Sequence, residues 1–224
     1  MGKLFVIEGT DGSGKQTQLE ALKNRFEKEQ IEFRNVSFPN YDSESSSLVK
    51  MYLSGKFGSN PSEINAYIAS TFYAADRYAT FKSEGFLDYY NSGGIILADR
   101  YTTSNMTFQA GKIEDESERN LFLDWLFDFE FNLYGLPVPT TSFFLDMPPK
   151  YAEELIKNRE NKFTHQSKKD IHERDSKYLE KIYTTSCNLA QKYGWHRINC
   201  VRNNSIRTIE DIHNEIFDEI QKYL

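Results

Sequence analysis

The stretch FVIEGTDGSGKQTQ, residues 5–18, decides the fold. An apolar run over residues 3–8 leads into a glycine-rich turn that fits G-x-x-x-x-G-K, and an amphipathic pattern follows at once. Glycines let successive backbone N–H groups turn towards one phosphate, and the start of the helix adds positive potential. The stretch therefore predicts a phosphate-binding loop whose nucleotide-binding residues are Gly9, Asp11, Gly12, Ser13, Gly14, Lys15, Gln16 and Thr17.

The residue after Lys15 is Gln16, where such loops usually carry a Ser or Thr that binds magnesium. Thr17 lies about 100° further round the helix, so its hydroxyl cannot take over that position. The other usual metal partner is a carboxylate at a strand end. We therefore predict Asp99, at the end of GIILAD, as the Mg²⁺ ligand. Asp146, at the end of FFLD, is a second candidate, although its place before Met-Pro-Pro is more typical of a helix start.

Short apolar runs alternate with helical patterns along the whole chain. The runs cover residues 3–8, 33–38, 94–99, 141–146 and 196–201. Between them, apolar residues recur every three or four positions, as in Leu19, Leu22 and Phe26, and in the final stripe Ile206, Ile209, Ile212, Ile216 and Ile220. This order predicts an α/β fold of the P-loop NTPase class, with about five parallel strands covered by helices on both faces in a single domain, residues 1–224.

The composition narrows the function classes. The chain has 27 basic and 33 acidic residues, a net charge of −6, which argues against a general nucleic-acid binder. It contains no run of 18 apolar residues, and its first residues, MGKLFVIEG, lead directly into a strand without a signal-peptide pattern. Cys187 and Cys200 have no spacing typical of zinc sites or disulfide frameworks. We expect a cytoplasmic protein whose partners are small molecules, with neither nucleic acid nor membrane among them.

Three motifs occur in order: GTDGSGKQTQ at residues 9–18, FPNY at 38–41 and DRY at 99–101. Together they resemble thymidylate kinases, the P-loop kinases that transfer the γ-phosphate of ATP to dTMP. The resemblance covers nearly the whole chain, since it includes YAADR (73–77), DRYTTSNMTFQ (99–109), GLPVP (135–139) and DIHERD (170–175). It implies a nucleoside-monophosphate-kinase fold, ATP and Mg²⁺ as cofactors, dTDP as the product on the way to dTTP, and a homodimer.

Two charged residues are expected where donor and acceptor meet. Arg100 follows the third strand at its carboxyl end, where ligands bind in open α/β sheets. The resemblance implies that Arg100 clamps the phosphates at this junction, with Lys15 on the donor side. Asp11 would repel phosphate unless it is paired. The resemblance places Asp11 near the phosphate and sugar of the acceptor, and we expect it to pair with Arg100 or to receive a metal-bound water.

One helix offers a face for base recognition. Tyr73, Asp76 and Arg77 are spaced so that all three project from one side of a helix. An aromatic ring can stack on a pyrimidine, and an arginine can donate to a base carbonyl. The resemblance implies that Tyr73 stacks on the base and that Arg77 reads it.

The resemblance supplies the rest of the acceptor pocket. Asn105 and Phe108 would lie near base and sugar, where the apolar ring of Phe108 would leave a ribose 2′-hydroxyl unpaired. Phe38, Pro39 and Tyr41 would begin the pocket. Relatives often carry an arginine at the third or fourth position of FPNY; here those residues are Asn40 and Tyr41. One cation for the acceptor phosphate is therefore missing, which places more weight on Arg100.

A polar segment, about residues 157–172, is the predicted lid. Some thymidylate kinases place a catalytic arginine inside the phosphate loop, where this chain has Gly12 and Ser13. The resemblance therefore assigns the catalytic cation to the lid, with Arg159 as the first choice and Lys162 as the next. Glu173 matches an acid at the lid end that approaches the acceptor. A catalytic base is not required, because the acceptor is already an ionised phosphate.

Other function classes stay open at this point. A deoxynucleoside kinase would need a base beside a sugar hydroxyl, for which Glu8 is the candidate, but the DRY motif and the polar segment argue against it. Another nucleoside-monophosphate kinase would share the loop. A nucleotide-binding switch protein of the GTPase type would need an [N/T]-K-x-D signature, and residues 161–164 lack the final Asp. A relative without activity is disfavoured because Lys15, Asp99 and Arg100 are all present.

Overall fold

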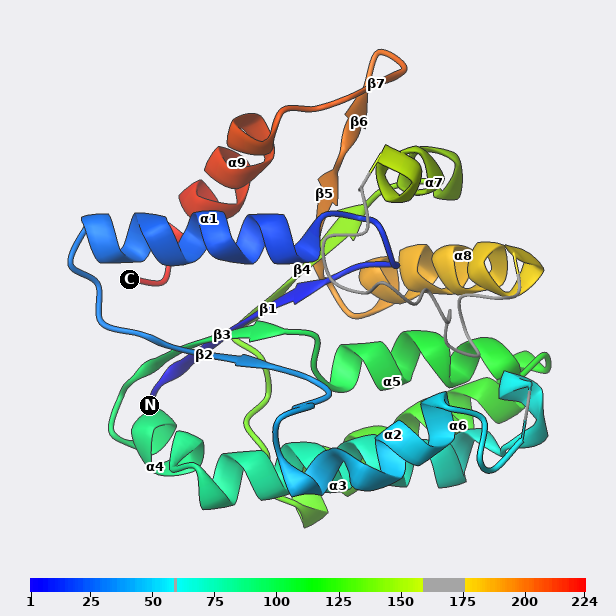
Figure 1. Cartoon of the computed structure of the whole chain (residues 1–224). Helices are drawn as coiled ribbons and strands as arrows, with labels where there is room; N and C mark the ends of the chain where they lie inside the picture. Colours follow the sequence, from blue (N-terminus) through cyan, green and yellow to red (C-terminus); the bar gives the residue numbers. More distant parts are fainter. Residues whose placement is uncertain (59, 159–175) are drawn as a thin grey trace.

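The computed structural model describes residues 1–58, 60–158 and 176–224. At its centre lies a parallel sheet of five strands in the order β2-β3-β1-β4-β5 (Figure 1). The strands are β1 (Lys3–Glu8), β2 (Arg34–Ser37), β3 (Ile95–Asp99), β4 (Thr141–Asp146) and β5 (His196–Asn199). All five coincide with the predicted apolar runs to within a few residues, so the predicted α/β fold is confirmed.

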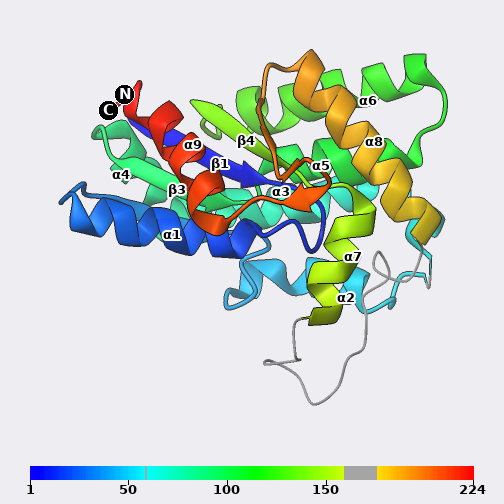
Figure 2. The same ribbon diagram turned by 90° about the horizontal axis from the view of Figure 1, so that it is seen from above.

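Helices cover both faces of this sheet. On one face lie α1 (Lys15–Lys28) and α9 (Ile209–Gln221), which Figure 2 shows over the strands. The elements on the opposite side are α3 (Ala66–Ser83), α4 (Phe86–Asn91), α5 (Thr102–Phe108) and α6 (Glu116–Phe127), preceded by α2 (Ser47–Leu53). Two more helices, α7 (Pro149–Asn158) and α8 (Ser176–Lys192), lie between β4 and β5 in the chain.

Short elements complete the described part of the chain. There are 3₁₀ turns at η1 (Glu44–Ser46), η2 (Pro61–Glu63) and η3 (Ala110–Lys112), and a π-helix, η4 (Asp128–Leu133), continues α6. The strands β6 (Val201–Arg202) and β7 (Ser205–Ile206) pair in a small antiparallel ladder. Within the described ranges, no helix is long and apolar enough to cross a membrane.

The central strand β1 shows why the sequence folds in layers. Phe5 and Ile7 pack with the core formed by α1 and α9, whereas Leu4 and Val6 pack with the core on the α3 and α4 side. All four side chains are fully buried. Because successive side chains of a strand point to opposite faces, a strand that is apolar at every position is buried on both.

The predicted isoleucine stripe was wrong at its first residue. Ile206 lies in β7, and α9 begins at Ile209. Thr208 caps this helix, because its side chain accepts a hydrogen bond from the backbone N–H of Asp211 and so fixes the start of the helix. The tight turn before β7 uses Asn203 and Asn204, both with positive φ, which favours a two-residue hairpin turn over a helix.

The predicted lid falls largely outside the described residues. Helix α7 ends at Asn158, and the next described residue is Ser176. Arg159, Lys162, Glu173 and the segment 161–164 therefore lie outside the described part, and their roles stay predictions.

Candidate active site

The phosphate loop connects β1 to α1, as predicted. Gly12 and Gly14 adopt the left-handed φ values of 79° and 91°, which glycine tolerates best. A Cβ at Gly12 would also lie 2.8 Å from both the carbonyl oxygen of Ala152 and a side-chain carbon of Ile156 in α7. The close approach of α7 therefore leaves no room for a side chain at Gly12. Gln16 is exposed on the first turn of α1.

Lys15 is held across the loop that precedes it. Its side chain is 8% exposed, and Nζ donates to the carbonyl oxygens of Gly9 at 2.9 Å and Thr10 at 3.0 Å. Burial lowers the pKa of Lys15 to about 8, and the charge of Arg100 acts in the same direction. Lys15 thus lies beside the phosphate-binding backbone as an amine that a bound anion would help to keep charged.

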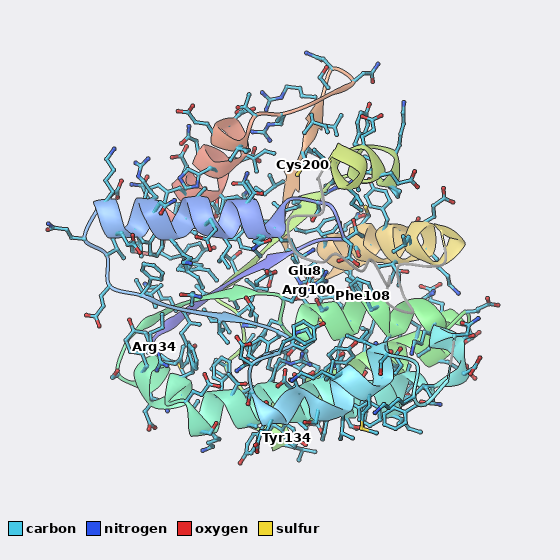
Figure 3. The ribbon with its side chains drawn as sticks, in the orientation of Figure 1. Glu8, Arg34, Arg100, Phe108, Tyr134 and Cys200 are labelled. Carbon is cyan, nitrogen blue, oxygen red and sulfur yellow. The ribbon has the colours of Figure 1, made fainter. Side chains whose placement is uncertain are left out.

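Arg100 lies where β1 and β3 end side by side, and its backbone N–H donates to Ile7 O at 3.1 Å. Its φ of 64° is uncommon for a residue with a side chain, and such strain clusters at functional sites. Its Nη2 donates to Asp11 Oδ1 at 2.5 Å, so the expected pairing is present. Its Nη1 lies 3.6 Å from Glu8 Oε1 (Figure 3). Burial lowers the pKa of Arg100, but these carboxylates outweigh burial and raise it.

Asp99, the predicted metal ligand, ends β3 next to this cluster. Its Oδ1 is buried and has no hydrogen-bond partner within the described part of the chain. Burial raises the pKa of Asp99, although Lys15 and Arg100 act to lower it. A buried carboxylate oxygen without a donor is suited to a cation or to a metal-bound water. Among the described residues, no group of three or more His, Cys, Asp or Glu side chains could hold a metal ion.

The second carboxylate candidate, Asp146, is engaged elsewhere. It accepts hydrogen bonds from Tyr183 at 2.7 Å and from Arg197 Nε at 2.8 Å. These two donors tie β4 to α8 and β5. Asp146 is therefore less suited to a metal than Asp99.

A cavity of about 230 Å³ opens beside Arg100. All the predicted acceptor residues in the described chain line it. They come from the phosphate loop, the segment after β2, the end of β3, and helices α3 and α5: Asp11, Phe38, Pro39, Tyr41, Tyr73, Arg77, Arg100, Asn105 and Phe108. The Arg100 guanidinium lies over the ring of Phe108, with Cζ 5.3 Å from the ring centroid. Figure 3 labels both residues. The cavity therefore places the predicted base-binding and phosphate-binding groups in one space.

Two predicted neighbours of the cavity turn away from it. Asp76 shares a helix face with Tyr73, but its carboxylate accepts from Asn40 N–H at 2.9 Å and from Ser45 Oγ. The Asn40 side chain donates to Thr80 on α3 and to Glu84, which caps the end of this helix. These bonds hold the segment after β2 against α3. Asn40 therefore does not replace the arginine that relatives often carry.

Glu8 belongs to the site, although the sequence suggested it only as the base of a deoxynucleoside kinase. Its side chain is 1% exposed and accepts from Gly9 N–H at 2.9 Å and from the hydroxyls of Thr103 and Ser104, both at 2.7 Å. Through these three donors and the nearby Arg100, Glu8 holds the loop against α5. It is poorly placed to serve as the base that a deoxynucleoside kinase needs.

Two further residues were missed. Gln109 lines the cavity, is 1% exposed, and has an Oε1 without a partner among the described residues. Its spacing of four from Asn105 within DRYTTSNMTFQ was a signal that could have found it. The other is Glu130 of η4, which forms a buried ion pair with Arg77. Its place in the aromatic stretch DFEFNL gave no comparable signal.

Comparisons with known proteins show which family the chain resembles. The family model described as thymidylate kinase matches residues 7–216. A thymidylate kinase of Plasmodium falciparum is 28% identical over 221 residues, which cover 99% of this chain and 90% of that protein. The thymidylate kinase of Mycobacterium tuberculosis H37Rv is 28% identical over 194 residues, 86% of this chain and 87% of that protein. A solved thymidylate kinase structure from Candida albicans shares the fold, with a TM-score of 0.70 at 18% identity over 99% of this chain and 92% of that one.

Proposed function

The chain belongs to the thymidylate kinase family, and from this premise we propose that it transfers the γ-phosphate of ATP to dTMP and so produces dTDP for dTTP synthesis. One observation carries the proposal. The Asp11–Arg100 pair joins the phosphate loop to the cavity that contains every described acceptor residue. A nucleoside-monophosphate kinase needs this junction of donor and acceptor sites.

The proposed mechanism uses electrostatics and positioning. Donor and acceptor are both anions, so the site must offset their repulsion while it excludes water. Lys15 would neutralise the donor phosphates from inside the loop, and Arg100 would lie between the transferred group and the acceptor phosphate. Asp11 would hold Arg100 in place. The lid residues Arg159, Lys162 and Glu173 would supply further charge when donor and acceptor are bound.

The acceptor base would lie between α3 and α5. In this proposal Tyr73 stacks on thymine, Arg77 donates to its O4, and Asn105 lies along the same edge. Phe108 presents an apolar edge towards the sugar. Gln109 adds a buried polar atom to this space, its Oε1, which the sequence reading left out.

An acceptor screen tests the function. Purified protein with Mg-ATP should convert dTMP to dTDP, with kcat/KM for dTMP above that for dAMP, dGMP, dCMP and thymidine. A coupled assay for ADP measures the rate, and chromatography identifies the product. If dTMP stays untouched while another monophosphate or thymidine turns over, the proposal is wrong.

We propose that Mg²⁺ is held chiefly by the nucleotide phosphates, with Asp99 as the protein ligand, directly or through water. Bound there, the ion would neutralise phosphate charge. Asp99→Asn is expected to weaken Mg²⁺ binding to the ATP complex by about tenfold or more. Mn²⁺ titration followed by electron paramagnetic resonance measures this without turnover. Asp146→Asn is the matched control and should leave metal affinity unchanged. Equal losses in both variants would contradict the assignment.

ATP binding is expected to be linked to proton uptake through Lys15. Free Lys15 has a pKa of about 8, and phosphate oxygens raise that pKa by favouring the ammonium form. Affinity should therefore be constant below about pH 7 and fall as the pH rises through 8, by up to tenfold per pH unit.

Titration calorimetry at pH 8.5 in two buffers of different ionisation enthalpy measures this proton uptake. Lys15→Met removes the amine and should abolish the uptake. If the wild type gives equal heats in both buffers, the linkage is absent.

We also propose a homodimer in the cytoplasm. Large apolar side chains are exposed on α3, α6 and η4, and we offer them as candidate contacts with a second copy: Ile68, Leu121, Phe127 and Leu133. The two free cysteines, Cys187 and Cys200, are typical of a reducing compartment.

A further inference from the structure

Glu130 lies behind the wall of the acceptor cavity. It belongs to η4, the π-helix that follows α6, and π-helical turns are frequent at functional sites. Its side chain is fully buried. The described residues that line the cavity do not include it. Glu130 can therefore act on a bound base only through its neighbours.

Four hydrogen bonds converge on the two carboxylate oxygens of Glu130. Oε2 accepts from Arg77 Nε at 2.6 Å and from Thr102 Oγ1 at 2.7 Å. Oε1 accepts from Arg77 Nη2 at 2.5 Å and from Asn105 Nδ2 at 3.2 Å. Two of these three partners, Arg77 and Asn105, line the cavity. One buried carboxylate thus orients two residues of the base site, which lie on different helices.

The ion pair fixes which edge of Arg77 faces the cavity. The guanidinium is planar and has five N–H donors in a rigid fork. A bidentate contact through Nε and Nη2 turns that edge towards Glu130. The donors of Nη1 then point away from the carboxylate. Arg77 can offer only hydrogen-bond donors to a ligand in the cavity.

The same carboxylate fixes the orientation of the Asn105 amide. Nδ2 donates to Glu130 Oε1 and to the carbonyl oxygen of Ser70, each at 3.2 Å. Both partners accept only, so the reversed amide would place its oxygen against two other oxygens. The amide oxygen of Asn105 is therefore directed away from Glu130 and Ser70. Asn105 therefore offers an acceptor beside the donors of Arg77.

We propose that Glu130 is a positioning residue that sets the donor and acceptor order of the base site, and thereby selects thymine over cytosine. The inference rests on the proposed function. Thymine presents the O4 acceptor next to the N3–H donor, whereas cytosine presents an N4 amino donor next to an N3 acceptor. A donor from Arg77 suits the O4 of thymine, and an acceptor from Asn105 suits its N3–H. Against cytosine, the same two groups would meet another donor and another acceptor. A base that leaves the buried polar groups of a site unpaired is rejected strongly.

Glu130→Gln tests the inference, because it replaces an acceptor oxygen with an amino group at the point where donors converge. The Asn105 amide can then reverse and offer a donor to the cavity. We expect kcat/KM for dTMP to fall by about 10- to 100-fold and the ratio of dTMP to dCMP values to fall by about tenfold or more. ATP affinity should stay unchanged. Calorimetric binding of dTMP and dCMP gives the same ratio without turnover.

Asp128→Asn is the matched control. Asp128 belongs to the same π-helix, the substitution makes the same change in charge, and its side chain is exposed. This variant should keep the wild-type ratio. If Glu130→Gln lowers thermal stability but keeps the ratio of dTMP to dCMP, Glu130 is only structural and the inference is overturned. If the wild type neither binds nor phosphorylates dTMP, the proposed function fails first, and that outcome is separate.

A second measurement keeps the test decisive if Glu130→Gln does not fold. In wild-type protein labelled with ¹⁵N, the Arg77 Nε–H and the Asn105 side-chain amide should exchange slowly with water before dTMP is added. Both signals should keep their shifts when dTMP binds, because their partner stays Glu130. Large shifts of both signals on binding would show that these contacts re-form around the base, and would overturn the inference.

Discussion

Arg100→Met is expected to lower kcat for dTMP phosphorylation by about 10³-fold or more, on the scale of other arginines that stabilise transferring phosphate. Arg100 is the cation that joins the two halves of the site, through Asp11 in the loop and Glu8 at the end of β1. In the described part of the acceptor cavity, the only other lysine or arginine is Arg77, which is paired with Glu130. Without Arg100, the negative charge on the transferred phosphate would therefore lose the cation at the junction of the two sites.

The electrostatics of the cluster strengthen this expectation. Two cations, Lys15 and Arg100, interact with three acids, Glu8, Asp11 and Asp99. Without Arg100, the three acids would face Lys15 alone, and the site would repel both nucleotides more strongly. The pKa of Asp99 would rise further, because Arg100 now acts to lower it. We therefore expect a higher KM for dTMP as well as a lower kcat.

Arg100→Lys separates charge from geometry. Lysine keeps the cation but lacks the fork that reaches two partners at once. The backbone strain at φ 64° is similar for methionine and lysine, so both variants should fold alike. Steady-state kinetics should rank kcat as wild type, then Arg100→Lys, then Arg100→Met. If Arg100→Met kept more than about a tenth of the wild-type kcat, the assigned role would be wrong.

The sheet and the phosphate loop could be predicted because their signals are local. Each of the five strands is a short apolar run that must be buried on both faces, and the loop glycines stand directly between a strand and a helix. The stripe from Ile206 onwards was over-extended for a local reason. Thr208 caps the helix, and the turn at Asn203 and Asn204 precedes it, but periodicity alone registers neither.

The contacts that hold the site together could not be predicted in the same way. Glu130 meets Arg77 across 53 positions of sequence. It does so from a π-helix, whose wider turn does not follow the 3.6-residue period used to assign faces. A carboxylate among aromatic residues also looks like an exposed position. Asp76 shows the converse, because it shares the face of Tyr73 and Arg77 but binds the segment after β2.

Asp11→Ala is expected to lower kcat/KM for dTMP by about 10²-fold while ATP affinity changes by less than about threefold. Asp11 lines the acceptor cavity and holds Arg100 at 2.5 Å. The donor side does not depend on it to the same extent, because Lys15 is held by the carbonyls of Gly9 and Thr10. The loop glycines set the phosphate cradle through their backbone. The two substrates should therefore respond differently to the loss of one side chain.

The measurement pairs turnover of dTMP with binding of a fluorescent ATP analogue. It is made at pH 7, where the pKa of Lys15, which Asp11 raises, matters least. Asp42→Ala, which removes an exposed acid next to Tyr41, is the control and should leave both quantities unchanged. Because Asp11 acts largely through Arg100, the double variant with Arg100→Met should lose much less than the product of the two single losses. Equal loss of dTMP turnover and ATP binding in Asp11→Ala would instead mean that this carboxylate shapes the loop for the donor, and the acceptor role would be wrong.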